Sequence, residues 1–152
     1  MTAPSSLEQL SARMADGTPQ ARALGLRFVS VEPGVAMMAV PWREDLVGEI
    51  DSGVIAGGVI TSLLDHVCGM ACSSLAFLGE TQPRSLATLD LRIDYMRPAI
   101  PRREVFARAR CYKLTRSIGF VRAAAFEADE EDPVATAQAA FALGNLPPVA
   151  RS

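Results

Sequence analysis

Cysteine, histidine and lysine are all scarce in this chain, and the scarcity narrows what the protein can be. The three cysteines, Cys68, Cys72 and Cys111, are an odd number without the spacing of a disulfide framework. This argues against a small secreted module held together by disulfides. Residues 1–10 have neither a basic start nor an apolar core, so we expect no secretory signal and a cytoplasmic location.

The basic residues are almost all of one type. Lys113 is the only lysine among 15 basic residues, and the others are arginines. Arginine forms bidentate contacts with phosphates, although an arginine-favouring genome gives the same composition. The net charge of −2 argues against nucleic acid or an anionic membrane as the main partner.

The chain of 152 residues, 49% of them apolar, is long enough for one globular domain with a sizeable core. We expect an N-terminal helix and lead-in over residues 1–20, a single domain over residues 21–146, and a C-terminal tail over residues 147–152. The capping box Ser5-x-x-Glu8, with Leu7, Leu10 and Met14 at helical spacing, predicts the first helix.

Alternating apolar and polar residues predict strands on both sides of one long helix. Residues 26–31 and 35–40, joined at Pro33-Gly34, predict a hairpin. After the helix, four strands in a meander are predicted over residues 86–96, 104–114, 118–128 and 134–143. In the first of them, Leu91 faces one side of the sheet and Thr88 the other. The order predicts an α+β fold in which one antiparallel sheet curls around the helix.

The helix from Gly57 to Leu78, with Gly79 as its expected C-cap, carries Asp65 as its only ionisable carboxylate. A helix so apolar is a core helix. Asp65 shares a stripe with small residues, namely Gly58, Thr61, Ser62, Gly69 and Cys72. Such a stripe lets a ligand or another backbone approach, and the acid suits a general base or nucleophile; a solvated surface acid is the alternative. His66, the only histidine, is expected to point about 100° away from Asp65, so the two form no dyad, and to be a packed or hydrogen-bonded helix residue.

Gly57 and Gly58 begin this helix with N–H groups that no side chain obstructs. Such donors can hold a developing oxyanion, although a double glycine also marks an ordinary loop-to-helix turn. The eight residues from Gly57 to Asp65 span about 12 Å, too far for one reacting carbonyl to contact both. If both serve one site, they come from different subunits, which predicts an oligomer.

Residues 55–65 (IAGGVITSLLD) and 88–99 (TLDLRIDYMRPA) resemble the PaaI-type acyl-CoA thioesterases of the hotdog fold, and the similarity extends over about residues 24–144. The resemblance implies a hotdog dimer, or a dimer of dimers, that hydrolyses an acyl-CoA or aryl-CoA to a free acid and coenzyme A. It implies that the Gly57 N–H polarises the thioester carbonyl. It also implies that the partner subunit supplies the acid matching Asp65 as base or nucleophile, and that Thr88 helps hold the water or the acid.

Coenzyme A is expected at the subunit interface, with no metal and no cofactor beyond this part of the substrate. Arg97 and Arg116 lie at a strand end and a turn, where guanidiniums can reach phosphates. The full set of expected substrate-binding residues is Ala56, Gly58, Ser62, Arg97, Arg116 and Ser117. The family usually has histidine where this chain has Ala56, and often asparagine where it has Ile50, so slower hydrolysis is expected. A non-catalytic acyl-CoA-binding protein and a hotdog hydratase or dehydratase stay open as alternatives.

Overall fold

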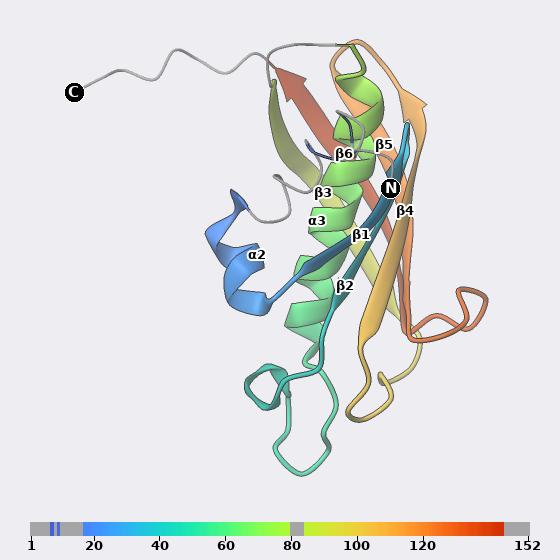
Figure 1. Cartoon of the computed structure of the whole chain (residues 1–152). Helices are drawn as coiled ribbons and strands as arrows, with labels where there is room; N and C mark the ends of the chain where they lie inside the picture. Colours follow the sequence, from blue (N-terminus) through green and yellow to red (C-terminus); the bar gives the residue numbers. More distant parts are fainter. Residues whose placement is uncertain (1–6, 8, 10–16, 80–83, 145–152) are drawn as a thin grey trace, which may run out of the picture.

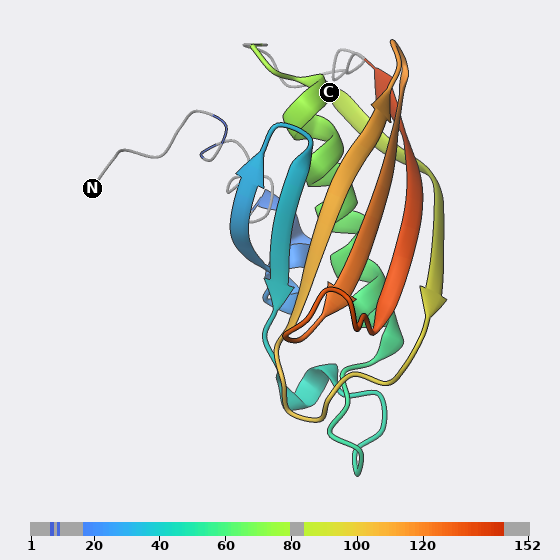
Figure 2. The ribbon, with the colours of Figure 1, turned by 90° about the vertical axis from the view of Figure 1, so that its right-hand side faces the viewer.

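The structure, a computed structural model, describes residues 7, 9, 17–79 and 84–144. Along the chain its elements are α2 (Pro19–Leu24), β1 (Arg27–Glu32), β2 (Val35–Val40), the 3₁₀ turn η1 (Glu44–Leu46), α3 (Gly57–Ala76), β3 (Ser85–Tyr95), β4 (Val105–Leu114), β5 (Ile118–Phe126) and β6 (Ala135–Gly144). The six strands form one antiparallel sheet that curls around α3, which is the predicted α+β hotdog fold (Figures 1 and 2). The predicted first helix, apart from Leu7 and Gln9, and the predicted tail lie outside the described residues.

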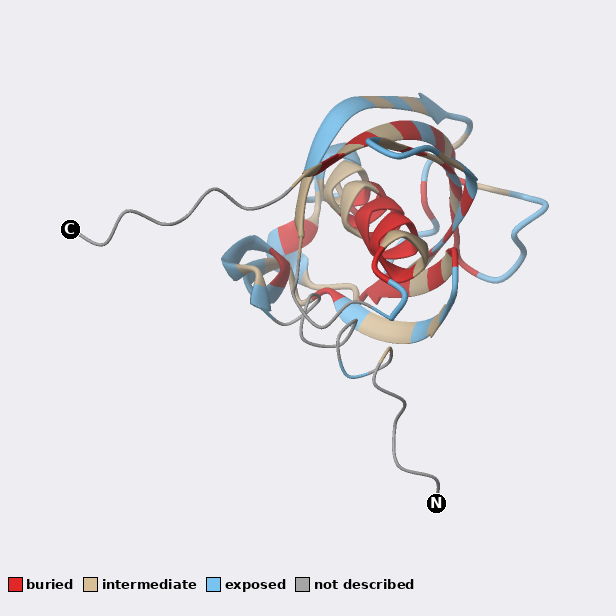
Figure 3. Ribbon diagram, turned by 90° about the horizontal axis from the view of Figure 1, so that it is seen from above, coloured by how far each residue is buried: buried red, intermediate tan, exposed pale blue. Residues whose placement is uncertain are grey.

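Helix α3 is the core around which the sheet packs. Viewed along the helix, buried residues cover most of its surface inside the curl of the sheet (Figure 3). Its leucines Leu63 and Leu64 are fully buried. By length and hydropathy α3 could span a membrane, but 67% of its most apolar window is buried inside the fold, as in a core helix. Gly69 allows Leu86 and Phe141 to approach the helix closely.

The position of β3 corrects the predicted meander. The strand order in the sheet is β1-β2-β4-β5-β6-β3, so only β4, β5 and β6 form a meander. β3 pairs with β6 at the far edge, and residues 96–104 then carry the chain across the end of the sheet to β4. The neighbour of β3 in the sheet depends on where the chain leaves α3. The alternation of apolar and polar residues along a strand does not identify its neighbour.

A β-bulge between Thr88 and Asp90 changes the direction of side chains along β3. Thr88 pairs with Phe141 and Asp90 pairs with Ala140, so the residue between them has no partner. Because one extra residue shifts the two-residue period, Thr88 and Leu91 both face the helix. The prediction that these two residues face opposite sides is therefore wrong.

Two helix boundaries also differ from the prediction. Helix α2 begins at Pro19 and ends at Leu24, and its C-cap Gly25 has a left-handed φ of 71°. It therefore extends across residue 20, where the N-terminal segment was expected to end and the domain to begin. Helix α3 ends at Ala76 with Phe77 as its C-cap, whereas the predicted cap Gly79 adopts a φ of 76° two residues later.

A buried ion pair holds the connection between β3 and β4. The side chain of Glu127, only 1% exposed, accepts hydrogen bonds from Arg97 Nη2 at 2.6 Å and Nη1 at 3.2 Å. It also accepts a bond of 2.6 Å from the Ile100 N–H. Burial raises the pKa of Glu127, but the hydrogen bonds from Arg97 and Ile100 and the Arg97 charge outweigh burial and lower the pKa below its ordinary value. One carboxylate thus fastens the connection to the end of β5.

Replacing Glu127 with glutamine keeps the shape and removes the charge that Arg97 binds. Because the Glu127 pKa is lower in the folded protein, its ionisation stabilises the fold above pH 4.5, and this contribution is lost as the pH falls toward the folded-state pKa. We expect Glu127→Gln to lower the free energy of unfolding by about 2–4 kcal/mol at neutral pH. The difference should shrink at acidic pH when urea unfolding is measured.

The matched control is Glu130→Gln, because Glu130 contacts Arg108 at 3.4 Å on the surface. This variant should lose no more than about 0.5 kcal/mol. A loss in Glu127→Gln that stays constant as the pH is lowered would contradict the ionic role of Glu127.

Candidate active site

Asp65 lies half-buried on α3 and faces the edge strand β3. The hydroxyl of Thr88 donates a hydrogen bond of 2.9 Å to Asp65 Oδ1. The bulge in β3 makes this contact possible, since an uninterrupted strand would turn Thr88 to the outer face. The structure therefore brings together the predicted acid and the residue predicted to assist it.

The Asp65–Thr88 pair opens on a hollow of about 250 Å³. The other residues that line it are mostly apolar, and they are Thr18, Met38, His66, Gly69, Met70, Leu86 and Phe141. A carboxylate and a hydroxyl at one wall of an apolar hollow suit a ligand with one polar, reactive end and one hydrocarbon part.

His66 lines the same hollow as Asp65. Its Nδ1–H donates a bond of 2.8 Å to the Ser62 carbonyl, as expected of a hydrogen-bonded helix residue. His66 and Asp65 are successive residues, about 100° apart around α3 as predicted, and both line this hollow. No hydrogen bond joins His66 to Asp65 within the described part of the chain, so the two form no dyad.

The first turn of α3 provides a second polar feature. Ala56 is the N-cap, and its carbonyl accepts the Val59 and Ile60 N–H groups at 3.0 and 3.3 Å. The N–H groups of Gly57 and Gly58 have no acceptor among the residues that the structure describes, and both glycines are exposed. They lie at the positive end of the dipole of a 20-residue helix. This is where a ligand oxygen with negative charge would be stabilised.

Tyr95 fixes this turn, a role that the sequence pattern did not predict. Its hydroxyl donates a bond of 2.6 Å to the Gly57 carbonyl and lies 2.6 Å from Thr61 Oγ1. The Gly57 carbonyl and the Gly58 N–H belong to one planar peptide unit, so Tyr95 also orients the Gly58 N–H. The available signal was the place of Tyr95 in the stretch TLDLRIDYMRPA, immediately before the strand breaks.

Gly57 and Asp65 do not meet within one chain. The eight residues between them correspond to about 12 Å along the helix. Gly57 lines a separate hollow of about 370 Å³ with Ile60, Tyr95 and Met96, among others. One chain therefore holds the acid and its hydroxyl partner in one place and the free N–H donors in another.

The other residues predicted to bind substrate have different surroundings. All five N–H donors of Arg97 are taken by protein acceptors, so this arrangement leaves none for a phosphate. Arg116 and Ser117 are exposed in the turn between β4 and β5, and Arg116 makes no ion pair with any described residue. The small side chain of Ala56 lies against Gly48, and Ile50 is 93% exposed in the preceding loop.

Comparisons with known proteins point to one family. Residues 52–134 match the family model of the thioesterase superfamily. A Salmonella typhimurium protein named medium/long-chain acyl-CoA thioesterase YigI is 29% identical over 155 residues, which cover 95% of this chain and 97% of that protein. The matched family segment includes Gly57, Asp65 and Thr88.

Solved structures share the fold. A protein from Pseudomonas aeruginosa superposes with a TM-score of 0.79 at 32% identity, covering 90% of this chain and 98% of that chain. The Escherichia coli PaaI protein from the phenylacetic acid degradation operon superposes with a TM-score of 0.77 at 19% identity, covering 93% of this chain and 96% of that chain. At that identity the second likeness concerns the fold alone.

Proposed function

Because the chain belongs to the thioesterase superfamily, we propose that it hydrolyses an acyl-CoA thioester to a free carboxylic acid and coenzyme A. The observation that carries this proposal is the Thr88–Asp65 hydrogen bond at the wall of an apolar hollow. It puts a carboxylate able to activate water beside a surface suited to an acyl group. The relative from Salmonella, named as an acyl-CoA thioesterase, supports the same substrate class.

In the proposed reaction Asp65 takes a proton from a water molecule that Thr88 helps to hold. The water oxygen bonds to the thioester carbonyl carbon, and the carbonyl oxygen becomes an oxyanion. The N–H of Gly57 stabilises this oxyanion at the positive end of α3. The oxyanion then reforms the carbonyl, the carbon–sulfur bond breaks, and the proton held by Asp65 passes to the sulfur. The products are the carboxylic acid and the coenzyme A thiol.

The first prediction for this mechanism concerns the acid. Asp65→Asn keeps the shape of the side chain and its contact with Thr88 but removes the base. We expect kcat to fall by about 10²-fold or more, measured as release of free thiol from acyl-CoA substrates, while the circular dichroism spectrum is unchanged. Unchanged turnover in this variant would refute the role of Asp65. Calorimetric binding of acyl-CoA without thiol release by the unmodified protein would instead favour the non-catalytic binding protein.

We infer that the complete site forms between two subunits. The inference rests on the separation of Gly57 and Asp65 along a single helix, which no rearrangement of one chain removes while α3 stays intact. In a dimer, the helix start of one subunit can lie beside the acid of the other. The N–H donor and the base then reach the same thioester carbonyl. Doubling to a dimer of dimers is compatible with the same site.

Mixing two inactive variants tests the shared site. Gly57→Pro removes the N–H donor, and proline fits the first helical position; Ala56 before it has the extended φ of −61° and ψ of 142° that precede proline. Each variant alone should be nearly inactive. Co-expression of Gly57→Pro with Asp65→Asn should restore about a quarter of full activity, because half of the random dimers carry one intact site out of two. Activity no higher than that of the separate variants, although mixed dimers form, would exclude the shared site.

We propose a medium- to long-chain acyl group as the substrate's acid part. The hollow beside Asp65 is walled by the buried side chains of Met38, Met70 and Phe141, which offer hydrocarbon surface. The Salmonella relative is named for medium- and long-chain substrates. Gly69, which has no side chain, leaves room in this hollow.

Cytoplasmic location stays a prediction, supported by the three free, buried cysteines.

The length of the acyl chain should therefore control the rate. Each added methylene buried in the hollow contributes about 0.8 kcal/mol, so kcat/KM should rise about fourfold per methylene until the hollow is filled and then level off. Gly69→Ala should move this plateau to a shorter chain, because the new methyl group lies 3.3 Å from Leu86 and 3.6 Å from Phe141. The Leu86 side chain must shift by a few tenths of an ångström, and the higher helix propensity of alanine offsets part of this cost. The measurement is thiol release over an acyl-CoA series, and the same plateau in both proteins would contradict the assigned hollow.

A further inference from the structure

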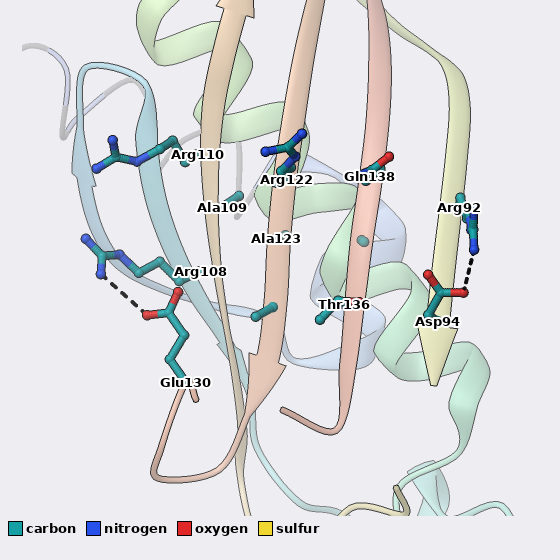
Figure 4. A pocket seen from close by; sticks show the side chains of 12 residues that line it. Arg92, Asp94, Arg108, Ala109, Arg110, Arg122, Ala123, Glu130, Thr136 and Gln138 are labelled. Carbon is teal, nitrogen blue, oxygen red and sulfur yellow. Dashed lines mark hydrogen bonds and ion pairs between the residues drawn. The ribbon is translucent and has the colours of Figure 1, made fainter. Parts of the chain in front are cut away.

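A row of polar side chains crosses the outer face of the sheet, on the side away from α3. Cross-strand pairing connects its four members in the order Arg110 of β4, Arg122 of β5, Gln138 of β6 and Arg92 of β3. All four are exposed, and Figure 4 shows them side by side on adjacent strands. We call this set the arginine row. The proposed hydrolysis does not use it, because the acid and its hydroxyl partner lie on the inner face.

Short side chains leave a hollow beside the arginine row. In the next cross-strand row, Ala124 of β5 pairs with Arg108 of β4 and with Thr136 of β6. Because alanine and threonine are short, an open hollow of about 560 Å³ lies between the longer side chains around them. This volume lies within the range of small-molecule sites, about 300–1,000 Å³.

The charge in this hollow is positive and only weakly compensated. Its lining contains four arginines and two carboxylates. The carboxylates of Asp94 and Glu130 lie 3.2 Å from Arg92 and 3.4 Å from Arg108, and all four side chains are widely exposed. Such exposed pairs are weak and are readily exchanged for a stronger anion.

Arg110 and Arg122 are the unusual members of the arginine row. They are direct cross-strand partners, and neither has a carboxylate partner within residues 17–79 and 84–144. Two like charges directly opposite each other destabilise a sheet. The Arg122 guanidinium is held 4.3 Å from the centre of the Tyr112 ring, in a cation–π contact. An anion between the two arginines would replace this repulsion with attraction.

We propose that the hollow beside the arginine row binds an anion that carries two linked phosphate groups. Guanidinium groups bind phosphate oxygens bidentately. Arg110 and Arg122 are cross-strand partners; the Arg110 head group points away from Arg122 in Figure 4, and its long side chain would turn toward Arg122 to share one phosphate. Arg92 lies two strands from Arg122, a separation of about 10 Å. A second linked phosphate extends toward Arg92, and Gln138 and Thr136 offer neutral hydrogen bonds between them. Free diphosphate compounds and the diphosphate of coenzyme A share this chemistry.

Calorimetric titration with inorganic pyrophosphate at constant ionic strength tests the site. We expect saturable binding to the full-length protein and weaker binding of inorganic orthophosphate. Arg110→Gln and Arg122→Gln should each weaken pyrophosphate binding about tenfold or more. The control Arg103→Gln removes an exposed charge outside the lining of the hollow and should change binding less than twofold. Equal weakening in all three variants, or no saturable binding of pyrophosphate, would overturn the proposal.

Two further arms identify the source of the phosphates and separate this proposal from the hydrolase. Displacement of pyrophosphate by coenzyme A, together with a raised KM for acyl-CoA in Arg122→Gln, would assign the hollow to the substrate's own diphosphate. Binding that coenzyme A does not displace would assign it to a separate ligand. The titration needs no turnover, so repeating it with Asp65→Asn gives the same result whether or not the protein hydrolyses thioesters.

Discussion

The enclosure of α3 by the curled sheet is the constraint on which the rest of the structure depends. Leu63, Leu64 and Val67 lose all contact with solvent in this enclosure, and each such side chain contributes about 1.5–3 kcal/mol of burial. A helix enclosed in this way needs small residues where strands cross it. Gly69 provides that space beneath Leu86 and Phe141. Tight packing thus requires a small residue at position 69, and the same glycine lines the hollow next to the acid.

The acid is tolerated in this core helix because it lies where the sheet ends. Asp65 faces the edge strand β3, and the Thr88 hydroxyl meets its carboxylate. Bulges are common at sheet edges and beside active sites, because a locally disrupted ladder can turn a side chain to the other face. Here the bulge gives one strand two functions. It directs Thr88 inward to the acid and continues outward with Arg92 in the arginine row.

Burial distinguishes Arg97 from the arginines on the outer face of the sheet. All N–H donors of Arg97 form hydrogen bonds with Glu127, Asp132 and Pro98, so Arg97 stabilises the connection between β3 and β4. The exposed arginines on the outer face have weak partners or none among the described residues. The same residue type therefore serves structure where a carboxylate is buried with it, and is available to a ligand where it is not.

Local patterns in the sequence determined much of the fold and part of the site. Hydrophobic periodicity marked the hairpin, the apolar helix and the strands, and the isolation of Asp65 in that helix marked the acid. The tertiary structure alone decided that β3 pairs with β6, that its bulge brings Thr88 to Asp65, and that Tyr95 fastens the helix start. It also decided that His66 shares the hollow of the acid and that Arg97 is engaged by Glu127. The reason is that period and spacing act over a few residues, whereas strand order, register shifts and the partner of a buried charge depend on segments that meet only in the folded chain.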